Sequence, residues 1–386
     1  MVDLPKRTKV VIVGGGVMGA STAYHLALKG CRDVVLLEKE PFFGHGATGK
    51  CAGGIRHQFS TEINVRLSQL SLPMLERFEE DTGQAIDLRW CGYLFLLNNE
   101  RDVAKFLHNV EMQNRLGVPT EWLSIEEIKI RTPLLATDDI LAGTFHAGDG
   151  LADPNGVVAG YISASRKMGV SAIPDTPVVD IIMKSGRISA VLTPAGKIEC
   201  EVLVNAAGPW SPIVSQMVEI PLPVTPIRRQ MLTTTPLEEI PSDFPFIIDF
   251  AQSLYFHREG EGILTGMSNP DQEPGFDESI DLPWESVHME AAITRLPVLA
   301  QAGRVSAWAG LYEVTPDAHP IMGPVPDLQG YYVVTGFSGH GFMHGPAAGL
   351  LMAEMILDGR ASSLDISMLD YQRFSEGRLI QEYNVI

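Results

Sequence analysis

Two short apolar runs, with a helical stretch between them, open the chain. The first run, VVIV at residues 10–13, is β-branched and uninterrupted by polar residues, which is typical of a strand buried in a parallel sheet. The Ala-rich stretch behind it predicts a helix that continues to about Lys29, where Gly30 stops it. The second run, VVLL at residues 34–37, predicts a neighbouring strand. The pattern therefore predicts a strand–helix–strand unit.

Beyond residue 60 the apolar spacing alternates between two periods. Helical spacing predicts helices over about residues 61–82, 101–116, 125–131, 154–168 and 285–295, and one that ends near residue 357. Short apolar or alternating runs predict strands over residues 87–97 and 331–336, and several more within 178–210 and 224–308. Residues 142–155 are rich in turn formers and predict a loop.

A glycine motif fills the turn after the first strand. Gly14, Gly16 and Gly19 follow the order G-x-G-x-x-G. In such a turn the first glycine permits the tight bend, the second lets the backbone approach a pyrophosphate, and the third lets the helix pack on the strand. The helix N-terminus adds free N–H groups and a positive dipole. Glu38, at the end of the second strand, can accept hydrogen bonds from ribose hydroxyls. The sequence therefore predicts a dinucleotide site.

Composition limits the classes of binding partner and the cellular compartment that we expect. A net charge of −18 argues against nucleic acid and anionic membranes, because their phosphates would be repelled. The four cysteines lie far apart and form no C-x-x-C pair, so we expect neither disulfides nor a zinc site. We expect no signal peptide, because MVDLPKRTK leads directly into the first strand, and no transmembrane segment, because no apolar run is long enough. These features predict a cytoplasmic protein.

Five stretches, in order, resemble one family of flavoproteins. They are VVIVGGGVMG with LLEK, GKCAGGIRHQF, VNAAGPWS, GLYEVTPDAHPIMG and VVTGFSGHGFMHGPAAG, and together they extend over nearly the whole chain. The chain is similar to the FAD-dependent amino-acid and amine oxidoreductases that include D-amino acid oxidase, glycine oxidase and sarcosine oxidase. It looks most like the β subunits of heterotetrameric sarcosine oxidases and of dye-linked L-proline dehydrogenases.

The resemblance implies an α/β plus α+β fold. A Rossmann-like, glutathione-reductase-like FAD-binding domain would be joined to a substrate-binding domain with a mostly antiparallel β-sheet. We expect residues 1–84, 150–222 and 327–386 to form the first domain, and residues 85–149 and 223–326 to form the second. The second Gly-rich turn, near the C-terminus, favours FAD over NAD because it opens a helix whose N-terminus would stabilise negative charge on a reduced flavin.

The motifs and the resemblance together imply an extended site for noncovalent FAD. The residues expected to bind the cofactor are Gly14, Gly16, Val17, Met18, Gly19, Glu38, Lys39, Thr48, Lys50, Ala52, Gly53, Gly54, Val179, Ala206, Ala207, Gly208, Trp210, Gly310, Gly339, His340, Gly341, Phe342 and Met343. His340 and His344 have H-x-x-x-H spacing, but Gly341 stands where a zinc protease has glutamate and no third ligand is evident. We therefore expect no metal site.

Four residues are candidates for substrate binding or catalysis. By resemblance, Arg56 falls where monomeric sarcosine oxidases hold the substrate carboxylate, and a guanidinium pairs with a carboxylate through two hydrogen bonds. We expect Tyr255 and Tyr312 to be pocket walls, with core packing as the alternative for each. The resemblance also implies that His340 lies near the flavin. In the monomeric enzymes a lysine helps to hold the substrate carboxylate, and here Met343 occupies that position. The identity of the substrate is therefore left undetermined.

Two departures from the family concern the flavin linkage and oxygen. Gly310, Lys50 and Pro154 occupy the positions at which relatives tether a flavin, so we expect noncovalent FAD and no second flavin. The lysine that activates oxygen in monomeric sarcosine oxidases aligns roughly with Leu264, which cannot stabilise superoxide. We therefore expect slow oxygen use, with electrons passed to another carrier or a partner subunit.

These expectations point to oxidation of a small amino acid with a secondary or N-methylated amine. A hydride would pass to flavin N5, and the imine would then be hydrolysed or, for proline, remain cyclic. No general base stands out, and solvent can remove the amine proton beforehand. The alternatives are a glycine or D-amino acid-type oxidase that produces hydrogen peroxide, an electron-transferring subunit of a larger complex, and a noncatalytic FAD-bearing assembly protein. An NAD-linked dehydrogenase would leave the second Gly-rich turn unexplained.

Overall fold

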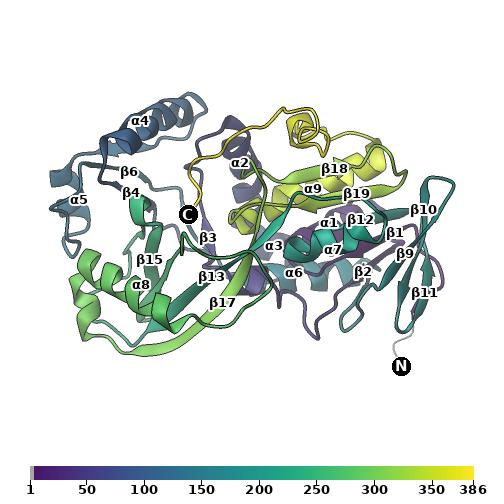
Figure 1. Cartoon of the computed structure of the whole chain (residues 1–386), viewed down its shortest axis with the longest axis horizontal. Helices are drawn as coiled ribbons and strands as arrows, with labels where there is room; N and C mark the ends of the chain where they lie inside the picture. Colours follow the sequence, from purple (N-terminus) through teal and green to yellow (C-terminus); the bar gives the residue numbers. More distant parts are fainter. Residues whose placement is uncertain (1–3) are drawn as a thin grey trace.

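A six-stranded sheet forms the core of one half of the molecule (Figure 1). In the computed structural model, which describes residues 4–386, its order is β18 (Ile321–Pro324), β19 (Tyr331–Thr335), β12 (Val202–Asn205), β1 (Val10–Val13), β2 (Val34–Leu37) and β8 (Ser171–Ile173). All pairs are parallel except β18 with β19. The buried strands predicted at residues 10–13 and 34–37 are confirmed, and every residue of both strands is buried. Their side chains are apolar on both faces of the sheet, as expected where other elements pack on both faces.

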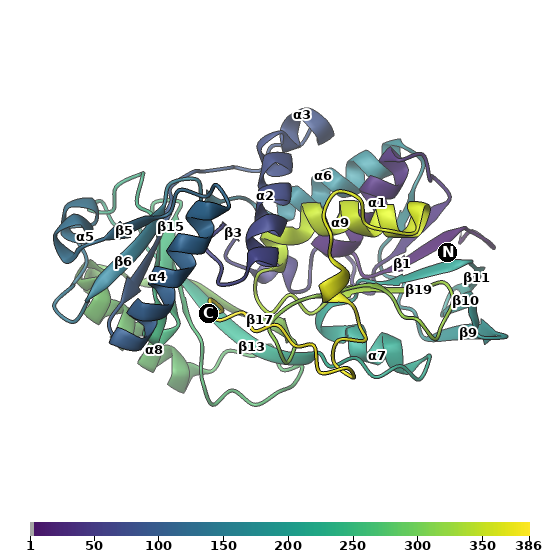
Figure 2. The same cartoon turned by 90° about the horizontal axis from the view of Figure 1, so that it is seen from above.

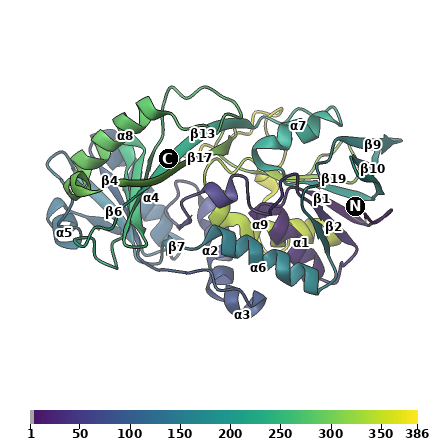
Figure 3. The same ribbon diagram turned by 90° about the horizontal axis from the view of Figure 1, so that it is seen from below.

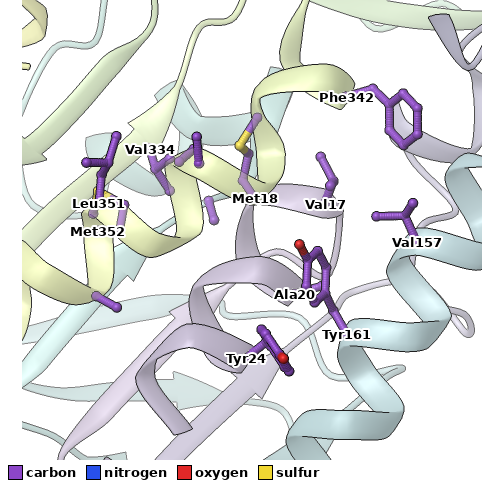
Figure 4. Close-up of a cluster of buried hydrophobic side chains, with 14 of the residues drawn as sticks. Val17, Met18, Ala20, Tyr24, Val157, Tyr161, Val334, Phe342, Leu351 and Met352 are labelled. Atoms are coloured by element: carbon purple, nitrogen blue, oxygen red, sulfur yellow. The ribbon is translucent and has the colours of Figure 1, made fainter. Parts of the chain in front are cut away.

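Helices cover one face of this sheet in a layer (Figure 2). The layer contains α1 (Val17–Leu28), α2 (Glu62–Glu76), α3 (Phe78–Thr82), α6 (Pro154–Lys167) and α9 (Gly341–Asp358), and α7 (Ser211–Gln216) lies on the other side. In the close-up of Figure 4, apolar side chains of α1, α6 and α9 fill the space between these helices. Small residues allow the contact of α9 with α1: a Cβ added at Gly349 would lie 2.1 Å from the Ser21 hydroxyl.

The other half is built on an eight-stranded sheet. Its order is β17 (Arg304–Val314), β13 (Thr225–Thr234), β16 (Gly262–Met267), β15 (Leu254–Glu259), β14 (Phe246–Asp249), β4 (Tyr93–Leu97), β6 (Ala142–His146) and β5 (Glu121–Leu123). Every neighbouring pair is antiparallel except β14 with β4. The helices of this half are α4 (Glu100–Arg115), α5 (Ile125–Arg131) and α8 (Leu282–Arg295). The mostly antiparallel second sheet is thus confirmed.

The remaining elements are two small sheets and several short helices. A three-stranded sheet consists of β9 (Asp180–Lys184), β10 (Arg187–Thr193) and β11 (Gly196–Glu199), and β3 (Gly54–Ile55) pairs with β7 (Gly150–Leu151). The short 3₁₀ helices are η1 (Thr48–Lys50), η2 (Gly208–Trp210), η3 (Phe250–Gln252), η4 (Pro297–Gln301) and η5 (Ser367–Leu369). No helix among residues 4–386 combines the length and apolarity that crossing a membrane requires.

Three expected elements have different bounds in the structure. The helix expected over 61–82 is interrupted at Arg77, so that α2 and α3 are separate. The strand expected over 87–97 forms only as β4, because Asp87 and Gly92 adopt positive φ angles of 46° and 77°. The expected loop 142–155 contains β6 and β7, since pairing with β4, β5 and β3 outweighs local turn propensity.

The two-domain division stays a prediction, and one strand bears on it. β18 falls within residues 223–326, which we assigned to the second domain, yet it pairs with β19 in the six-stranded sheet.

The last residues return to the middle of the molecule, where the C-terminus lies between the two halves (Figures 1 and 3). We call residues 380–386 the C-terminal strap. Glu382 in the strap is buried and accepts five hydrogen bonds, from the Ser60 backbone and hydroxyl, the Thr61 hydroxyl, the Asn64 amide and the Asn384 backbone. The strap is therefore anchored to the segment that follows β3.

Candidate functional site

One cavity extends from the first glycine turn to the eight-stranded sheet. Its walls come from the β1–α1 turn, the segment around η1, η2, strands β13, β15 and β17, the start of α9 and the end of the C-terminal strap. Segments from both halves of the molecule, far apart in sequence, therefore meet around a single space.

The first glycine turn shapes one end of the cavity with backbone. Gly14 has φ +110°, and a Cβ there would lie 2.3 Å from the Ala206 carbonyl oxygen. Gly16 is the N-cap of α1 and offers no capping side chain, so N–H groups of the first helical turn remain for a ligand. At Gly19 a Cβ would lie 1.9 Å from the Gly14 carbonyl oxygen, which explains why the helix needs glycine there.

Glu38 stands where the motif predicts an acidic residue. Its carboxylate is buried and accepts hydrogen bonds from the Gly15 and Glu40 backbones at 2.6 and 2.9 Å. Each carboxylate oxygen has two lone pairs, so these bonds leave acceptor capacity for ribose hydroxyls. The Thr48 hydroxyl accepts a hydrogen bond from the Val17 backbone at 3.1 Å and ties η1 to the same turn. Glycine backbone, a helix N-terminus and a buried acid together fit an adenine dinucleotide.

The cavity brings together most of the residues expected to bind the cofactor. Those that line it are Gly14, Gly16, Val17, Met18, Glu38, Lys39, Thr48, Lys50, Ala52, Gly53, Gly54, Ala206, Ala207, Gly208, Trp210, Gly310, Gly339, His340, Gly341, Phe342 and Met343. Two lie elsewhere. Gly19 is behind the turn in the helix–strand contact, and Val179 is 52% exposed while its neighbour Val178 lines the cavity.

The second glycine turn is fastened by a residue that the sequence analysis missed. Glu313 is partly buried and accepts hydrogen bonds from the Thr335 hydroxyl and the Phe337 backbone at 2.9 and 3.2 Å. Burial raises the pKa of this carboxyl, although those donors oppose the effect. An acid directly after a buried strand segment, in GLYEV, is the signal that could have revealed it. Glu313 holds β17 against the turn that opens α9.

The two histidines of this turn bond to each other and to protein groups. His340 Nδ1 lies 3.2 Å from His344 Nδ1, and His340 Nε2 lies 3.0 Å from the Ala318 carbonyl oxygen. His344 Nε2 is 3.0 Å from the Ser68 hydroxyl. Burial lowers the pKa of His340 to about 3 and that of His344 well below its usual value. Both rings are therefore neutral near pH 7.

Arg56 lies in the cavity wall, but its amino groups are engaged by backbone. The side chain is buried, one amino group donates to the Gln58 carbonyl, and the other donates to the Asn384 carbonyl at 2.5 Å. The guanidinium carbon lies 4.0 Å from the centre of the Phe59 ring. The residue predicted to hold a substrate carboxylate therefore also holds the C-terminal strap.

A sheet face with aromatic side chains forms the opposite end of the cavity. Tyr255 on β15 and Tyr312 on β17 both line it, as expected for pocket walls, and Tyr93 on β4 joins them. Burial raises the pKa of each of these phenols, so all three carry their proton near pH 7. Between the tyrosines stands Arg229 of β13, which the sequence analysis also missed; its guanidinium carbon is 5.2 Å from the Tyr312 ring centre.

Comparison with known proteins identifies the family. Residues 9–355 match the family described as FAD dependent oxidoreductase. The chain belongs to this family.

The similarity to known proteins extends over almost the entire length of this FAD-dependent oxidoreductase. It is 31% identical to the mitochondrial dimethylglycine dehydrogenase of Rattus norvegicus, covering 96% of this chain and 45% of the relative. It is 28% identical to the mitochondrial pyruvate dehydrogenase phosphatase regulatory subunit of Mus musculus, covering 97% and 44%. The crystal structure of L-proline dehydrogenase from P. horikoshii is 32% identical, with a TM-score of 0.91 over 97% of this chain and all of that one.

The chain therefore spans about half the length of the curated relatives it matches. Family membership confirms FAD as the cofactor and the fold class that the five motifs imply.

Two positions at which the resemblance places flavin tethers adjoin each other in this oxidoreductase. A Cβ added at Gly310 would lie 2.9 Å from Cβ of Lys50, and the Lys50 ammonium pairs with Glu278 at 2.7 Å. Cys51, next in sequence, also lines the cavity, and burial raises the pKa of its thiol to about 11. Leu264 is buried in an apolar cluster with Tyr255 and Met231.

Three further polar residues gather beside Arg56. Ligand atoms of His57, His146 and Asp149 lie within 4.8 Å of one another. The Asp149 carboxylate already accepts hydrogen bonds from the His57 backbone at 2.7 Å and the Gln58 amide at 3.1 Å, and His57 Nδ1 lies 2.9 Å from it. These bonds fix the loop that carries Arg56.

Proposed function

We propose that this protein oxidises the C–N bond of a small amino acid whose amine is secondary or N-methylated. The observation that carries the proposal is the single cavity that joins a dinucleotide cradle to an aromatic pocket with a buried guanidinium. The similarity to dimethylglycine and L-proline dehydrogenases supports the same substrate class. FAD, when bound, supplies the hydride acceptor for such an oxidation.

The residues around the pocket would favour a neutral amine. Tyr255 and Tyr312 keep their protons, so each can place a hydroxyl and an aromatic face against the amine. His340 is neutral and adds no positive charge. Val385 and Ile386 of the C-terminal strap line the cavity and add apolar surface to it. Solvent can remove the amine proton before the substrate enters, so no general base is required.

We further propose that the enzyme is a dehydrogenase. Leu264 lies in apolar surroundings where the resemblance places an oxygen-activating lysine, so no cation there would stabilise superoxide. Electrons would then leave through another carrier or a partner subunit.

Anaerobic reduction of the bound FAD tests the proposal. Sarcosine, dimethylglycine, L-proline, D-proline, glycine and D-alanine are added separately while absorbance near 450 nm is followed, and air is then admitted. We expect bleaching by a secondary or N-methylated amino acid and recovery at least about tenfold slower in air than with an artificial electron acceptor. Bleaching by glycine or D-alanine with rapid recovery would identify a peroxide-producing oxidase instead.

A noncatalytic role is the second candidate function. The similarity to a phosphatase regulatory subunit favours it. Failure of every amine to bleach the FAD would support this alternative, particularly if the protein forms a complex whose stability depends on bound FAD.

A further inference from the structure

Arg229 is a half-buried cation that forms no ion pair within residues 4–386. Its Nε is buried and has no hydrogen-bond partner, and one amino group donates to the Arg228 carbonyl at 3.0 Å. Three other arginines are buried more deeply, and all have partners: Arg295 pairs with Asp139 and Asp249, Arg373 pairs with Asp317, and Arg56 donates to two backbone carbonyls. Because a buried charge is costly unless it is paired, Arg229 lacks the anion that its position calls for.

The sheet register places Arg229 on the face of the sheet that borders the cavity. Arg229 lies directly opposite Gly310 of β17, which has no side chain, and Met231 lies opposite Gly266 of β16. Tyr255 is the next residue across the sheet from Gly266. The Tyr255 ring occupies the space over Gly266 and the Lys50 side chain the space over Gly310, and Arg229 lines the cavity beside them. Burial lowers the pKa of Arg229, as expected for a group partly shielded from water.

Arg228, the preceding residue, illustrates the alternation of a strand. Its guanidinium is held by Asp277 at 3.0 Å, Asp281 at 3.5 Å and Gln272 at 3.0 Å. Successive side chains of a strand point to opposite faces, so one arginine of the pair is satisfied outside the cavity and the other is presented inside it.

We propose that Arg229 binds the carboxylate of the amino-acid substrate, between Tyr255 and Tyr312. This inference rests on the proposed function and specifies its substrate class: the pocket selects amino acids over simple amines. Arg56, whose amino groups hold the carbonyls of Gln58 and Asn384, is then a positioning residue for the C-terminal strap. A guanidinium fork on β13 orients a carboxylate through two parallel hydrogen bonds, which a lysine cannot reproduce.

The test uses ligands that bind without being oxidised. Methoxyacetate and tetrahydrofuran-2-carboxylate are sarcosine and proline with oxygen in place of nitrogen. Each is titrated into the FAD-loaded protein, and binding is followed from the change in the oxidised flavin spectrum. We expect Arg229→Gln to weaken both about 100-fold and Arg229→Lys about tenfold, because a desolvated charge contact is lost or loses its second hydrogen bond. The matched control Arg228→Lys should change binding less than twofold.

Two further measurements separate the possible explanations. Tetrahydrofurfuryl alcohol, which lacks the carboxylate, should bind the wild type and Arg229→Gln equally, and FAD content should be unchanged in every variant used. The inference is overturned if the wild type binds neither carboxylate, if Arg229→Gln binds them normally, or if only Arg56→Lys loses them. Since these ligands are never oxidised, a result that depends on Arg229 stands even where no amine reduces the flavin and the proposed reaction fails.

Discussion

The two ends of the cavity differ in which part of the chain forms their surface. At the cofactor end glycine backbone shapes the surface beside the Glu38 carboxylate: Gly14 leaves no space for a Cβ, and Gly16 opens a helix without a capping side chain. At the substrate end the surface is side chains, Arg229, Tyr255 and Tyr312, carried by three long strands. Backbone contacts recognise what all dinucleotides share, whereas side chains can be exchanged without altering the fold. The comparison teaches that this scaffold fixes its cofactor and leaves its substrate adjustable.

The largest effect is expected where backbone shapes the site. Gly14→Ala should abolish FAD binding, because the new Cβ would lie 2.3 Å from the Ala206 carbonyl oxygen and alanine is strained at φ +110°. The purified variant should be colourless or insoluble. The matched control is Gly275→Ala, where nothing lies within 4 Å of the added Cβ, and this variant should remain yellow. A yellow, stable Gly14→Ala protein would contradict the comparison.

A smaller effect is expected at the strap that covers the pocket. Burial alone would raise the pKa of Glu382, but hydrogen bonds from Ser60, Asn384 and Asn64 outweigh it and hold the pKa below 4.5. A lowered pKa means that the carboxylate stabilises the fold above pH 4.5, and that this contribution is lost as the pH falls below that value. Glu382→Gln should cost about 2–3 kcal/mol at pH 7, because five donors lose a charged acceptor.

Thermal or urea unfolding between pH 3 and pH 7 measures this contribution. The difference between wild type and Glu382→Gln should shrink as the pH falls below 4.5. A difference that stays constant with pH would show that the carboxylate charge does not anchor the strap.

Single hydroxyl groups at the substrate end should have moderate effects. Tyr255→Phe and Tyr312→Phe should each slow anaerobic flavin reduction about 3- to 10-fold, the loss of one hydrogen bond, while FAD affinity stays the same. The control is Tyr24→Phe on α1, because Tyr24 packs in the helix layer (Figure 4) and does not line the cavity. Equal effects on FAD affinity and on substrate reduction would show that the two ends of the cavity are not independent.

The smallest expected effect concerns Cys51. We predict noncovalent FAD, so acid precipitation should release all flavin into the supernatant from wild type and from Cys51→Ser alike. Flavin retained in the wild-type pellet and released from Cys51→Ser would reveal a thioether bond and overturn the prediction.

The sequence predicted the cofactor end more completely than the substrate end, for a physical reason. A glycine turn between a strand and a helix is local, so Gly14, Gly16 and Glu38 could be assigned from spacing alone. Arg229 could not, because two adjacent arginines occupy β13 and only the register with Gly310 determines which one faces the cavity. The cofactor-binding position predicted at Val179 is one residue away from the cavity, because Val178 lines the cavity instead.

The position of the C-terminal strap could not be predicted from the sequence for a different reason. Residues 380–386 have no periodicity, and their position depends on Glu382 finding donors more than three hundred residues earlier in the chain. Arg56 was predicted to hold a substrate carboxylate, but its partner in the strap, Asn384, could not be inferred from the neighbouring sequence.

The contact between α1 and α9 has a consequence for how the protein is made. The first glycine turn leaves the ribosome long before β19, which extends the parallel sheet, and α9, which packs its glycines on α1, because about three hundred residues separate them in the chain. Until then α1 exposes apolar surface and half of the cofactor's walls are missing. We therefore expect FAD to bind only after α9 has emerged, and the apolar face of α1 to stay uncovered until then.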